Sequence, residues 1–386
     1  MPPSPSRLAT PTAHRVAGPI RVLHVVGSMD RGGVETWLMN VLRGTDRTQV
    51  AMDFLVHRDA RGVYDDEIEA LGARIWRCPG TDQPLGYARR FGRALEANGP
   101  YQIVHSHVFW YSGWVLYLAR RAGVPTRIAH SHTGGMAKTD AAWRRLYERT
   151  MRASIAANAT AGFGISDAAG RALFGTRWGV DPRWQLLLYG FDFSRFRIPV
   201  DRAAVRAKLG IPAGRRLVGH VGRFSAVKNH AFLVRVFRRL VDRGCDAHLL
   251  LVGGGELEHA IRRQVAELGL SDRVTLTGVQ SDVAPLLRTM ELKLFPSHYE
   301  GLGIVLLEAQ AAGIPTLAAS AVPPEAAVVP GLVEYRPLAD GEEAWAAATE
   351  RLLTLAPVPG ALAQVEASPF GISRCLTGLM KAYGAN

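Results

Sequence analysis

Cysteine is scarce in this chain of 386 residues, and its spacing excludes two kinds of scaffold. The three cysteines, Cys78, Cys245 and Cys375, lie far apart in the sequence, and no C-x-x-C pair occurs. Disulfide-rich secreted folds and zinc-stabilised folds need cysteines at close, regular spacing. We therefore expect three reduced, buried thiols in a cytoplasmic protein.

Long hydrophobic runs are also missing. The most membrane-like run covers residues 108–119 and ends at Arg120 and Arg121. It is too short to cross a bilayer, which takes about 20 apolar residues in a helix, so a buried helix is expected. Residues 1–19 contain five prolines and no apolar core segment. This composition predicts a disordered tail rather than a signal peptide.

Three motifs of nucleotide chemistry are absent as well. The segment "GSMDRGGVE" after the first predicted strand is not G-x-G-x-x-G, and "LLVGGGELEHAI" lacks the G-K-[ST] ending of an ATPase loop. No D-x-D occurs, so the chain lacks a carboxylate device for holding a metal on a sugar nucleotide. We expect neither a bound cofactor nor a metal.

Positive charge is plentiful, but lysine is rare. The net charge is +12, of which +9 falls within residues 1–195, and all but five of the 46 basic residues are arginine. A basic first half suits an anionic partner such as a membrane surface, a phosphorylated substrate or nucleic acid. An arginine-rich composition without a partner explains it equally well.

Short apolar runs alternate with helical patterns from Arg21 onward, and the pattern restarts near Arg216. Predicted strands of the first half are "RVLHVV", "AMDFLVH", "RIWRC", "YQIVHSH" and "TRIAHSH"; those of the second are "RLVGHVG", "AHLLLVG", "RVTLTG", "LKLFPS" and "PTLAAS". Continuous apolar strands alternating with helices are typical of parallel sheets covered on both faces. The sequence therefore predicts an α/β protein with two doubly wound, Rossmann-like domains, in which ligands bind at the carboxyl ends of the strands. The expected divisions are a tail at 1–19, domains at 20–194 and 195–370, and a final helix within 371–386 that covers another surface.

Two glutamates in "HYEGLGIVLLEAQAAG" raise the question of catalysis. Glu300 and Glu308 are eight positions apart, roughly 12 Å if the segment is helical. Paired carboxylates of a glycosidase lie about 5 to 9.5 Å apart around one bond, so these two are too distant to share a reacting atom. They can instead hold two ends of an elongated ligand, with a helix N-terminus between them that suits phosphate. A sugar nucleotide has this layout, and Arg223 and Lys228 supply cations near a strand end.

Histidines form the pattern "HSH" twice, at His105 and His107 and again at His130 and His132. Strand alternation places both histidines of each triplet on one face. Four histidines allow a zinc site, although no carboxylate or cysteine accompanies them at ligand spacing. The alternative is hydrogen-bonded core histidines, which suits His105 and His130, with His107 and His132 at the carboxyl edge.

Together, "GRFSAVKN" and "HYEGLGIVLLEAQAAG" resemble the G-R-x-x-x-x-K and E-x7-E signature of family 4 retaining glycosyltransferases, which have the GT-B fold. The segments "HVVGSMDRGGVETWLMNVLR", "IVHSHVFWYSG", "RIAHSHTGG" and "EAQAAGIPT" are most similar to the branch that builds bacterial exopolysaccharide and capsule. The resemblance covers nearly the whole chain from Arg21. It implies two domains facing across a cleft and a final helix that returns to the first domain.

The resemblance also implies roles for individual residues. The expected catalytic group is Arg223, Lys228, Glu300 and His132; the expected donor-binding group is Gly32, Gly33, Gly222, Val279, Gly301, Leu302, Gly303, Ile304 and Glu308; His107 is expected on the acceptor side. Within these groups, Arg223 and Lys228 hold the diphosphate, Glu308 the ribose and Val279 the base. Two positions depart from the family pattern: Tyr189 replaces an asparagine in "LYGFD", and Gly254 replaces a common acidic residue.

These features imply transfer of a sugar from a nucleotide sugar, with a UDP-sugar favoured, to a carbohydrate or lipid-linked glycan. Open alternatives are a sugar-nucleotide epimerase, a small-molecule or antibiotic glycosyltransferase, and a non-enzymatic basic scaffold or nucleic-acid binder; the intact signature residues disfavour the last, and no nucleic acid is expected. The helix at residues 141–155 combines apolar residues at helical spacing with four arginines. It predicts peripheral contact with an anionic inner membrane surface, although an ordinary packed helix explains it too.

Overall fold

The structure is a computed structural model that describes residues 18–30, 32–133 and 142–385. Residues 1–17 of the expected tail lie outside the described residues, as does residue 141 of the basic helix. The chain divides into two compact units, Met1–Phe191 with Ile372–Asn386, and Asp192–Gly371. The amide of Ile372 donates to the carbonyl oxygen of Phe191 (3.1 Å), so the chain leaves and re-enters the first unit at one place. These junctions lie close to, but not at, the boundaries expected after residues 194 and 370.

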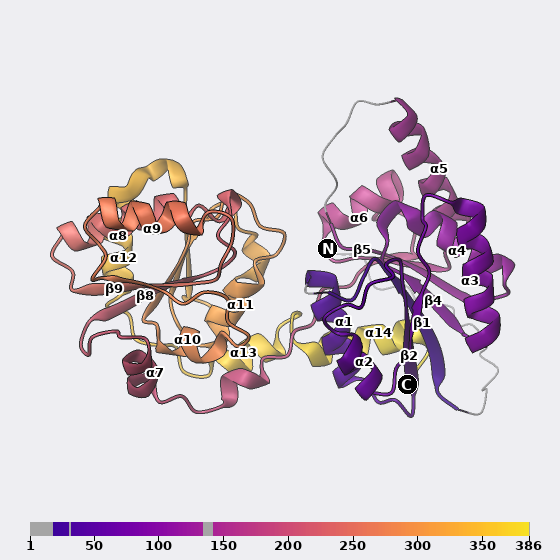
Figure 1. Cartoon of the computed structure of the whole chain (residues 1–386), viewed down its shortest axis with the longest axis horizontal. Coiled ribbons are helices and arrows are strands. Elements are labelled where there is room, and N and C mark those ends of the chain that lie inside the picture. The colour runs from indigo at the N-terminus through magenta and orange to yellow at the C-terminus, as the bar shows by residue number, and fades with distance from the viewer. Residues whose placement is uncertain (1–17, 31, 134–141, 386) are drawn as a thin grey trace, which may run out of the picture. The chain divides into compact units, whose positions relative to one another are not determined.

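The first unit contains a parallel sheet of seven strands in the order β3-β2-β1-β4-β5-β6-β7 (Figure 1). Its strands are β1 (Ile20–Val26), β2 (Val50–Val56), β3 (Ile75–Arg77), β4 (Ile103–Ser106), β5 (Thr126–Ser131), β6 (Ala161–Gly164) and β7 (Trp184–Leu186). Its helices are α1 (Gly33–Gly44), α2 (Asp65–Ala70), α3 (Pro84–Asn98), α4 (Ser112–Arg121), α5 (Ala142–Asn158), α6 (Asp167–Phe174) and α14 (Ile372–Tyr383). Helices α1 and α14 pack together, and α3, α4 and α5 form a second layer.

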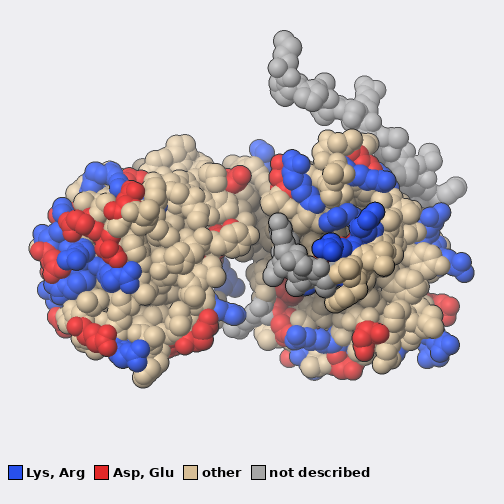
Figure 2. Space-filling view, turned by 90° about the horizontal axis from the view of Figure 1, so that it is seen from above, with Lys and Arg blue, Asp and Glu red and all other residues tan. Residues whose placement is uncertain are grey.

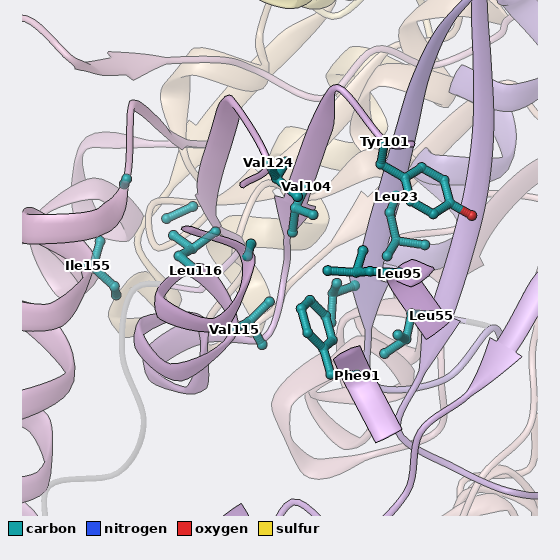
Figure 3. Packing of buried hydrophobic residues seen from close by; sticks show 14 of the residues in the cluster. Leu23, Leu55, Phe91, Leu95, Tyr101, Val104, Val115, Leu116, Val124 and Ile155 are labelled. Carbon is teal, nitrogen blue, oxygen red and sulfur yellow. The ribbon is translucent and has the colours of Figure 1, made fainter. Parts of the chain in front are cut away.

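The core of the first unit lies between the sheet and the layer of α3, α4 and α5. Leu23 and Leu55 from the strands lie beside Phe91 and Leu95 of α3 in Figure 3, and all four are buried. The apolar run at residues 108–119 is partly this buried helix α4, as the sequence predicts. No helix within the described residues is long and apolar enough to cross a membrane.

The second unit contains a parallel sheet of six strands in the order β10-β9-β8-β11-β12-β13. Its strands are β8 (Arg216–Val221), β9 (Ala247–Val252), β10 (Val274–Leu276), β11 (Leu292–Phe295), β12 (Thr316–Ala319) and β13 (Val333–Arg336). Its helices are α7 (Arg202–Lys208), α8 (His230–Asp242), α9 (Glu258–Glu267), α10 (Ala284–Thr289), α11 (Ile304–Ala311), α12 (Gly341–Leu352) and α13 (Ala361–Ala367). Helices α8, α9 and α12 lie on one side of the sheet, with α10, α11 and α13 on the other (Figure 1).

Helix α14 belongs to the first unit although it ends the described chain. Its apolar face supplies Cys375, Leu379 and Tyr383 as buried residues. The indole Nε1 of Trp37 on α1 donates to the Cys375 sulfur (3.2 Å), and Tyr383 shares a hydrogen bond with His105. Returning to the first unit thus gives this apolar face a buried partner.

Candidate active site

The loop after β8 carries the first predicted phosphate-binding residues. Gly222 follows the strand directly, and the side chain of Arg223 is exposed, with no ion pair among the residues that the structure describes. A Cβ at Gly253 would clash with the Gly222 carbonyl oxygen, so glycine lets the loops after β8 and β9 approach closely. The glycine triplet that resembles a phosphate loop therefore has a packing role.

Lys228 and Glu300 form the central ion pair of the second unit. Their side-chain atoms Nζ and Oε1 lie 2.5 Å apart, and the side chains keep 21% and 8% of their surface exposed. The two motifs also meet through the main chain, because the His298 amide donates to the Val227 carbonyl oxygen (2.8 Å). Two segments that are distant in sequence thus form one charged site at the carboxyl ends of β8 and β11.

Helix α11 begins at this site with an uncapped N-terminus. Gly303, its N-cap residue, has φ 76° and ψ 54°, and no side chain accepts a hydrogen bond from the first turn. A Cβ there would also lie 3.2 Å from the Phe295 ring, so position and backbone both require glycine. Gly301 and Leu302 precede it in a loop, and Ile304 opens the helix. Free amides and the positive end of the helix dipole suit a phosphate.

Glu308 lies one turn into α11, beside a buried lysine that the sequence reasoning passed over. Burial raises the pKa of Glu308 to about 7, and the positive charge of Lys293 opposes this shift. Burial likewise lowers the pKa of Lys293 to about 7, opposed by Glu300 and Glu308. The ammonium of Lys293 lies 3.5 Å from the Phe295 ring centroid and has no hydrogen-bond partner among the described residues. Its place inside the apolar run "LKLF" is the signal that could have revealed it.

Val279 lies beyond β10, at the same sheet edge. Its side chain is 71% exposed, and Gly278 before it has a positive φ of 70°. A Cβ at Gly254 would lie 3.2 Å from the Val279 side chain, so an acidic residue at position 254 would crowd it. The departure at Gly254 therefore leaves the exposed side chain of Val279 uncrowded.

The predicted glycines of the first unit stand at the start of α1. Gly32 is its N-cap and Gly33 its first residue, again without a side-chain cap. A Cβ at Gly32 would clash with the carboxylate of Glu35, which lies over this end of the helix. Burial raises the pKa of Glu35, and a hydrogen bond from its own amide opposes that shift. The sequence reasoning did not identify Glu35.

Five histidines gather at the carboxyl ends of β1, β4 and β5. The rings within each "HSH" triplet lie 4.3 Å and 4.1 Å apart, so each pair shares a face as predicted. His24 of β1, which the sequence reasoning missed, joins them. His105 bonds Tyr383 (2.7 Å), but neither ring nitrogen of His130 has a partner among the described residues, which corrects the expectation of a hydrogen bond there.

The same histidines include two groups whose nitrogen atoms lie within 4.8 Å of one another. These groups are His24, His105 and His107, and His107, His130 and His132. However, both ring nitrogens of His107 form hydrogen bonds: Nδ1 with His132 (2.8 Å) and Nε2 with His24 (3.0 Å). A zinc ligand must direct a free lone pair at the metal. His107 has none free in the structure, because one ring nitrogen donates a hydrogen bond and the other accepts one.

Comparisons with known proteins place this chain among glycosyltransferases. The family model "Glycosyl transferase 4-like domain" matches residues 32–190, and "Glycosyl transferases group 1" matches residues 201–358. The chain is 39% identical to "Putative glycosyltransferase EpsF" of Bacillus subtilis (strain 168), over 84% of this chain and 86% of that protein. It is 34% identical to "D-inositol 3-phosphate glycosyltransferase" of Rhodococcus jostii (strain RHA1), over 75% of this chain and 68% of that protein.

Solved structures share the fold at lower identity. A Rickettsia africae ESF-5 glycosyltransferase superposes with a TM-score of 0.77 at 17% identity, covering 95% of this chain and 98% of its own. Anabaena Alr3699/HepE in complex with UDP gives 0.74 at 19% identity, covering 94% and 99%. The two parallel-sheet units are consistent with the GT-B fold. The two family models and the relative at 39% identity show that this chain belongs to the family 4 glycosyltransferases.

Proposed function

We propose that this glycosyltransferase transfers a hexose from a UDP-sugar to a hydroxyl group, with retention of the anomeric configuration. The observation that carries the proposal is the Lys228–Glu300 pair beside the uncapped start of α11, with Glu308 one turn further on. The ammonium of Lys228 and the free amides at the start of α11 suit a diphosphate, and the carboxylate of Glu308 suits the ribose that follows it.

The donor is expected to bind in an extended form along the second unit. Arg223 and Lys228 would neutralise the diphosphate, and the amides from Gly301 to Ile304 would bind its oxygens and the sugar. Glu308 would accept hydrogen bonds from the ribose hydroxyls, and Val279 would contact the base. Lys228 pairs with Glu300, so a diphosphate that binds Lys228 would compete with Glu300 and release that carboxylate for the sugar.

Departure of the diphosphate is the step that these charges favour. Cations and helix amides stabilise the negative charge that develops on the leaving oxygen. In a retaining transfer the leaving phosphate can itself take the proton from the acceptor hydroxyl on the same face. No side chain then needs to act as a covalent nucleophile, and we assign none.

The proposed acceptor is a carbohydrate or a lipid-linked glycan, as in the synthesis of exopolysaccharide or capsule. A small phosphorylated molecule is the second candidate, because the Rhodococcus relative is named for D-inositol 3-phosphate. Transfer assays with UDP-glucose and each acceptor class separate the two. A parallel reaction without acceptor tests the epimerase alternative, because an epimerase changes the donor alone.

We propose that the transfer needs no divalent metal. The chain has no D-x-D motif, and Arg223 and Lys228 place positive charge where a metal would otherwise neutralise the diphosphate. In the first unit the nitrogens of His107 are already engaged by its neighbouring histidines. Both observations favour side-chain cations as the electrophilic groups.

The binding step can be tested before any acceptor is known. UDP and UDP-glucose should raise the melting temperature, because a ligand that binds only the folded state stabilises it by mass action. ADP-glucose and GDP-mannose serve as base-specificity controls. Transfer to an acceptor with inversion, or equal stabilisation by all nucleotides, would contradict the proposed donor and mechanism.

Helix α5 supports the proposal of peripheral contact with an anionic membrane. Its first part exposes Trp143 (72%) and Leu146 (67%), while Ile155 is buried near its end. Basic side chains gather on the face of the first unit from which α5 projects (Figures 1 and 2). Arg145 and Arg149 of α5 are exposed. Exposed apolar residues beside arginines suit the boundary between headgroups and acyl chains.

Two of the arginines that the sequence predicts for this surface are engaged elsewhere. Arg144 pairs with Glu148 (3.4 Å) and lies 5.8 Å from the Trp110 ring centroid. Arg152 donates to the carbonyl oxygens of Leu173 (3.1 Å) and Ala172 (2.8 Å), which anchors α5 to α6. The membrane contact that we propose therefore rests on Arg145 and Arg149, because the other two arginines hold the helix in place.

A further inference from the structure

An unbranched chain of hydrogen bonds runs through the first unit from Tyr189 to His24. The Tyr189 hydroxyl lies 2.7 Å from His132 Nδ1, and His132 Nε2 lies 2.8 Å from His107 Nδ1. His107 Nε2 then lies 3.0 Å from His24 Nδ1. The chain ends at His24 Nε2, which is buried and has no partner among the described residues. Both ring nitrogens of His132 and of His107 are therefore occupied.

Because the three histidine rings are neutral, all hydrogen bonds of this chain must point in the same direction. Burial lowers the pKa of each of the three histidines well below its usual value, to about 3 for His24 and for His132. A neutral imidazole carries one N–H donor and one acceptor nitrogen. Each ring must therefore accept on one side and donate on the other, and all members must point the same way.

The buried end at His24 decides which direction is favoured. If the Tyr189 hydroxyl donated to His132, then His132 would donate to His107 and His107 to His24. His24 would then carry its proton on Nε2, where no acceptor is available. A buried donor or acceptor without a partner costs about 1–3 kcal/mol, but buried N–H groups without a partner are the rarer of the two in folded proteins. In the opposite direction His24 Nε2 is a bare lone pair, and each histidine carries its proton on Nδ1. Tyr189 then accepts from His132, and its own proton is free for another oxygen.

We propose that Tyr189 donates a hydrogen bond to an oxygen of the substrate, and that His132, His107 and His24 are positioning residues that hold its hydroxyl for this purpose. The proposal rests on the proposed function, and it gives a substrate contact to Tyr189 in place of His132, which the family resemblance put in the catalytic group. His132 cannot offer a nitrogen to a sugar while both of its nitrogens are bonded.

The surroundings of Tyr189 fit a donor to a hydroxyl group. Its ring stacks on Trp37 at 5.3 Å and on His132 at 5.5 Å, so packing fixes its position. The carboxylate of Glu35 is near enough to contribute to the raised pKa of Tyr189, after burial. A sugar hydroxyl placed at the start of α1 could accept from Tyr189 and donate to Glu35, which satisfies both of its hydrogen-bonding roles. The tyrosine at the family's asparagine position thereby acquires a function.

The first experiment is Tyr189→Phe, which removes one oxygen and keeps both stacked rings. We expect kcat/KM for transfer from UDP-glucose to fall at least tenfold, with the melting temperature nearly unchanged. Tyr87→Phe is the matched control, because Tyr87 is also a buried tyrosine bonded to a histidine, His57 (3.0 Å), outside the chain. Undiminished transfer by Tyr189→Phe, or an equal loss in Tyr87→Phe, would overturn the proposal.

The second experiment tests the positioning role. His24→Phe keeps the stacking on Phe54 but ends the chain at His107, whereas His24→Asn retains a donor at the Nδ1 position. We expect transfer to drop several-fold in His24→Phe and to recover in His24→Asn. The double variant His24→Phe with Tyr189→Phe should be no worse than Tyr189→Phe alone, because both act through one hydroxyl. Independent, additive losses would refute the chain.

Nitrogen-15 NMR of the histidine rings supplies a measurement that needs no activity. We expect the Nδ1–H form for His24, His107 and His132 in the wild-type protein, and the same Nδ1–H form at His132 in His24→Phe, because the shortened chain still ends at a buried nitrogen without an acceptor. The Nε2–H form at His132 would reverse the direction and overturn the proposal. If no UDP-sugar were bound or transferred, the proposed function would fail, whereas the ring protonation would still report on the chain itself.

Discussion

Replacing Lys293 by methionine should stabilise the protein, although it removes a charged residue from the candidate site. Burial lowers the pKa of Lys293 from 10.5 to about 7. One pKa unit corresponds to about 1.4 kcal/mol, so burying this lysine opposes folding by on the order of 4 kcal/mol at neutral pH. Losing its positive charge raises the pKa of Glu308 further, which offsets part of the gain. We expect a net gain of about 2 kcal/mol in the free energy of unfolding.

A gain of this size is measurable by calorimetry. For domains of 150–250 residues, 1 kcal/mol shifts the melting temperature by about 2–4 °C, so Lys293→Met should melt roughly 4–8 °C higher at pH 7. Lys208→Met, on the exposed side of α7, is the matched control and should melt with the wild type. A lower melting temperature for Lys293→Met alone would show that Glu300 and Glu308 stabilise the ammonium by more than its burial costs.

The pH dependence of stability gives the same prediction a sharper form. Because the folded pKa of Lys293 lies below its unfolded value, the unfolded chain binds more protons between about pH 7 and 10.5. Stability from this group therefore rises with pH across that window, and Lys293→Met should lose the rise. Glu308 acts in the opposite sense: its folded pKa is raised from 4.5 to about 7, so its contribution falls as pH rises between those values. A wild-type curve without either slope would refute both shifts.

Four further predictions follow from the site and from α5. Lys228→Ala and Glu308→Ala should each lower kcat/KM at least tenfold, because each loses a charged hydrogen bond worth on the order of 2 kcal/mol; near-normal activity of both would refute the donor site. Gly303→Ala should abolish donor-induced stabilisation, since its φ of 76° and the Phe295 ring both exclude a Cβ, whereas Gly269→Ala, with φ 65° and open space, shows the strain alone. EDTA should leave transfer unchanged, and recovery of lost activity by Mn²⁺ would contradict metal independence. Arg145→Gln with Arg149→Gln should weaken co-sedimentation with anionic vesicles at low salt, and equal binding to neutral vesicles would exclude the electrostatic contact.

The fold was predictable wherever strands are apolar and continuous. All ten predicted strands are present, because buried parallel strands such as "AHLLLV" carry an unbroken apolar signal. Three strands were missed. Strand β6 reads "AGFG" and has two glycines, β7 has three residues, and β13 reads "VEYR" at the edge of its sheet. Two glycines in β6 and two charged residues in β13 interrupt the apolar pattern, which leaves too few apolar side chains for these strands to be recognised in the sequence.

The candidate site was predictable as a set of strand ends but not as a set of contacts. Parallel strands bring their carboxyl ends to one edge, so Lys228 and Glu300 could be expected near each other. No motif encodes the side-chain geometry that pairs Lys228 directly with Glu300. The same is true of the buried Lys293, whose pKa is influenced by the charges of both Glu300 and Glu308. Likewise, "HSH" predicts two histidines on one face, but the link to His24 needs the register that pairs His24 with His105 across β1 and β4.

Both candidate sites hold polar groups that a core built for stability alone would not retain. Lys293 has an unbonded ammonium, and His130 has two unbonded ring nitrogens, each buried beside strand ends where the predicted site residues lie. Such groups cost folding free energy, so stabilising replacements should be available at these positions. If Lys293→Met gains stability and loses donor binding while Lys208→Met changes neither, the cost of burying Lys293 is linked to function. Stability and function can be compared in the same way for variants of His130, with variants of the buried His248 in the second unit as controls. A gain in stability with a loss of function at His130 alone would link the cost of burying this histidine to function.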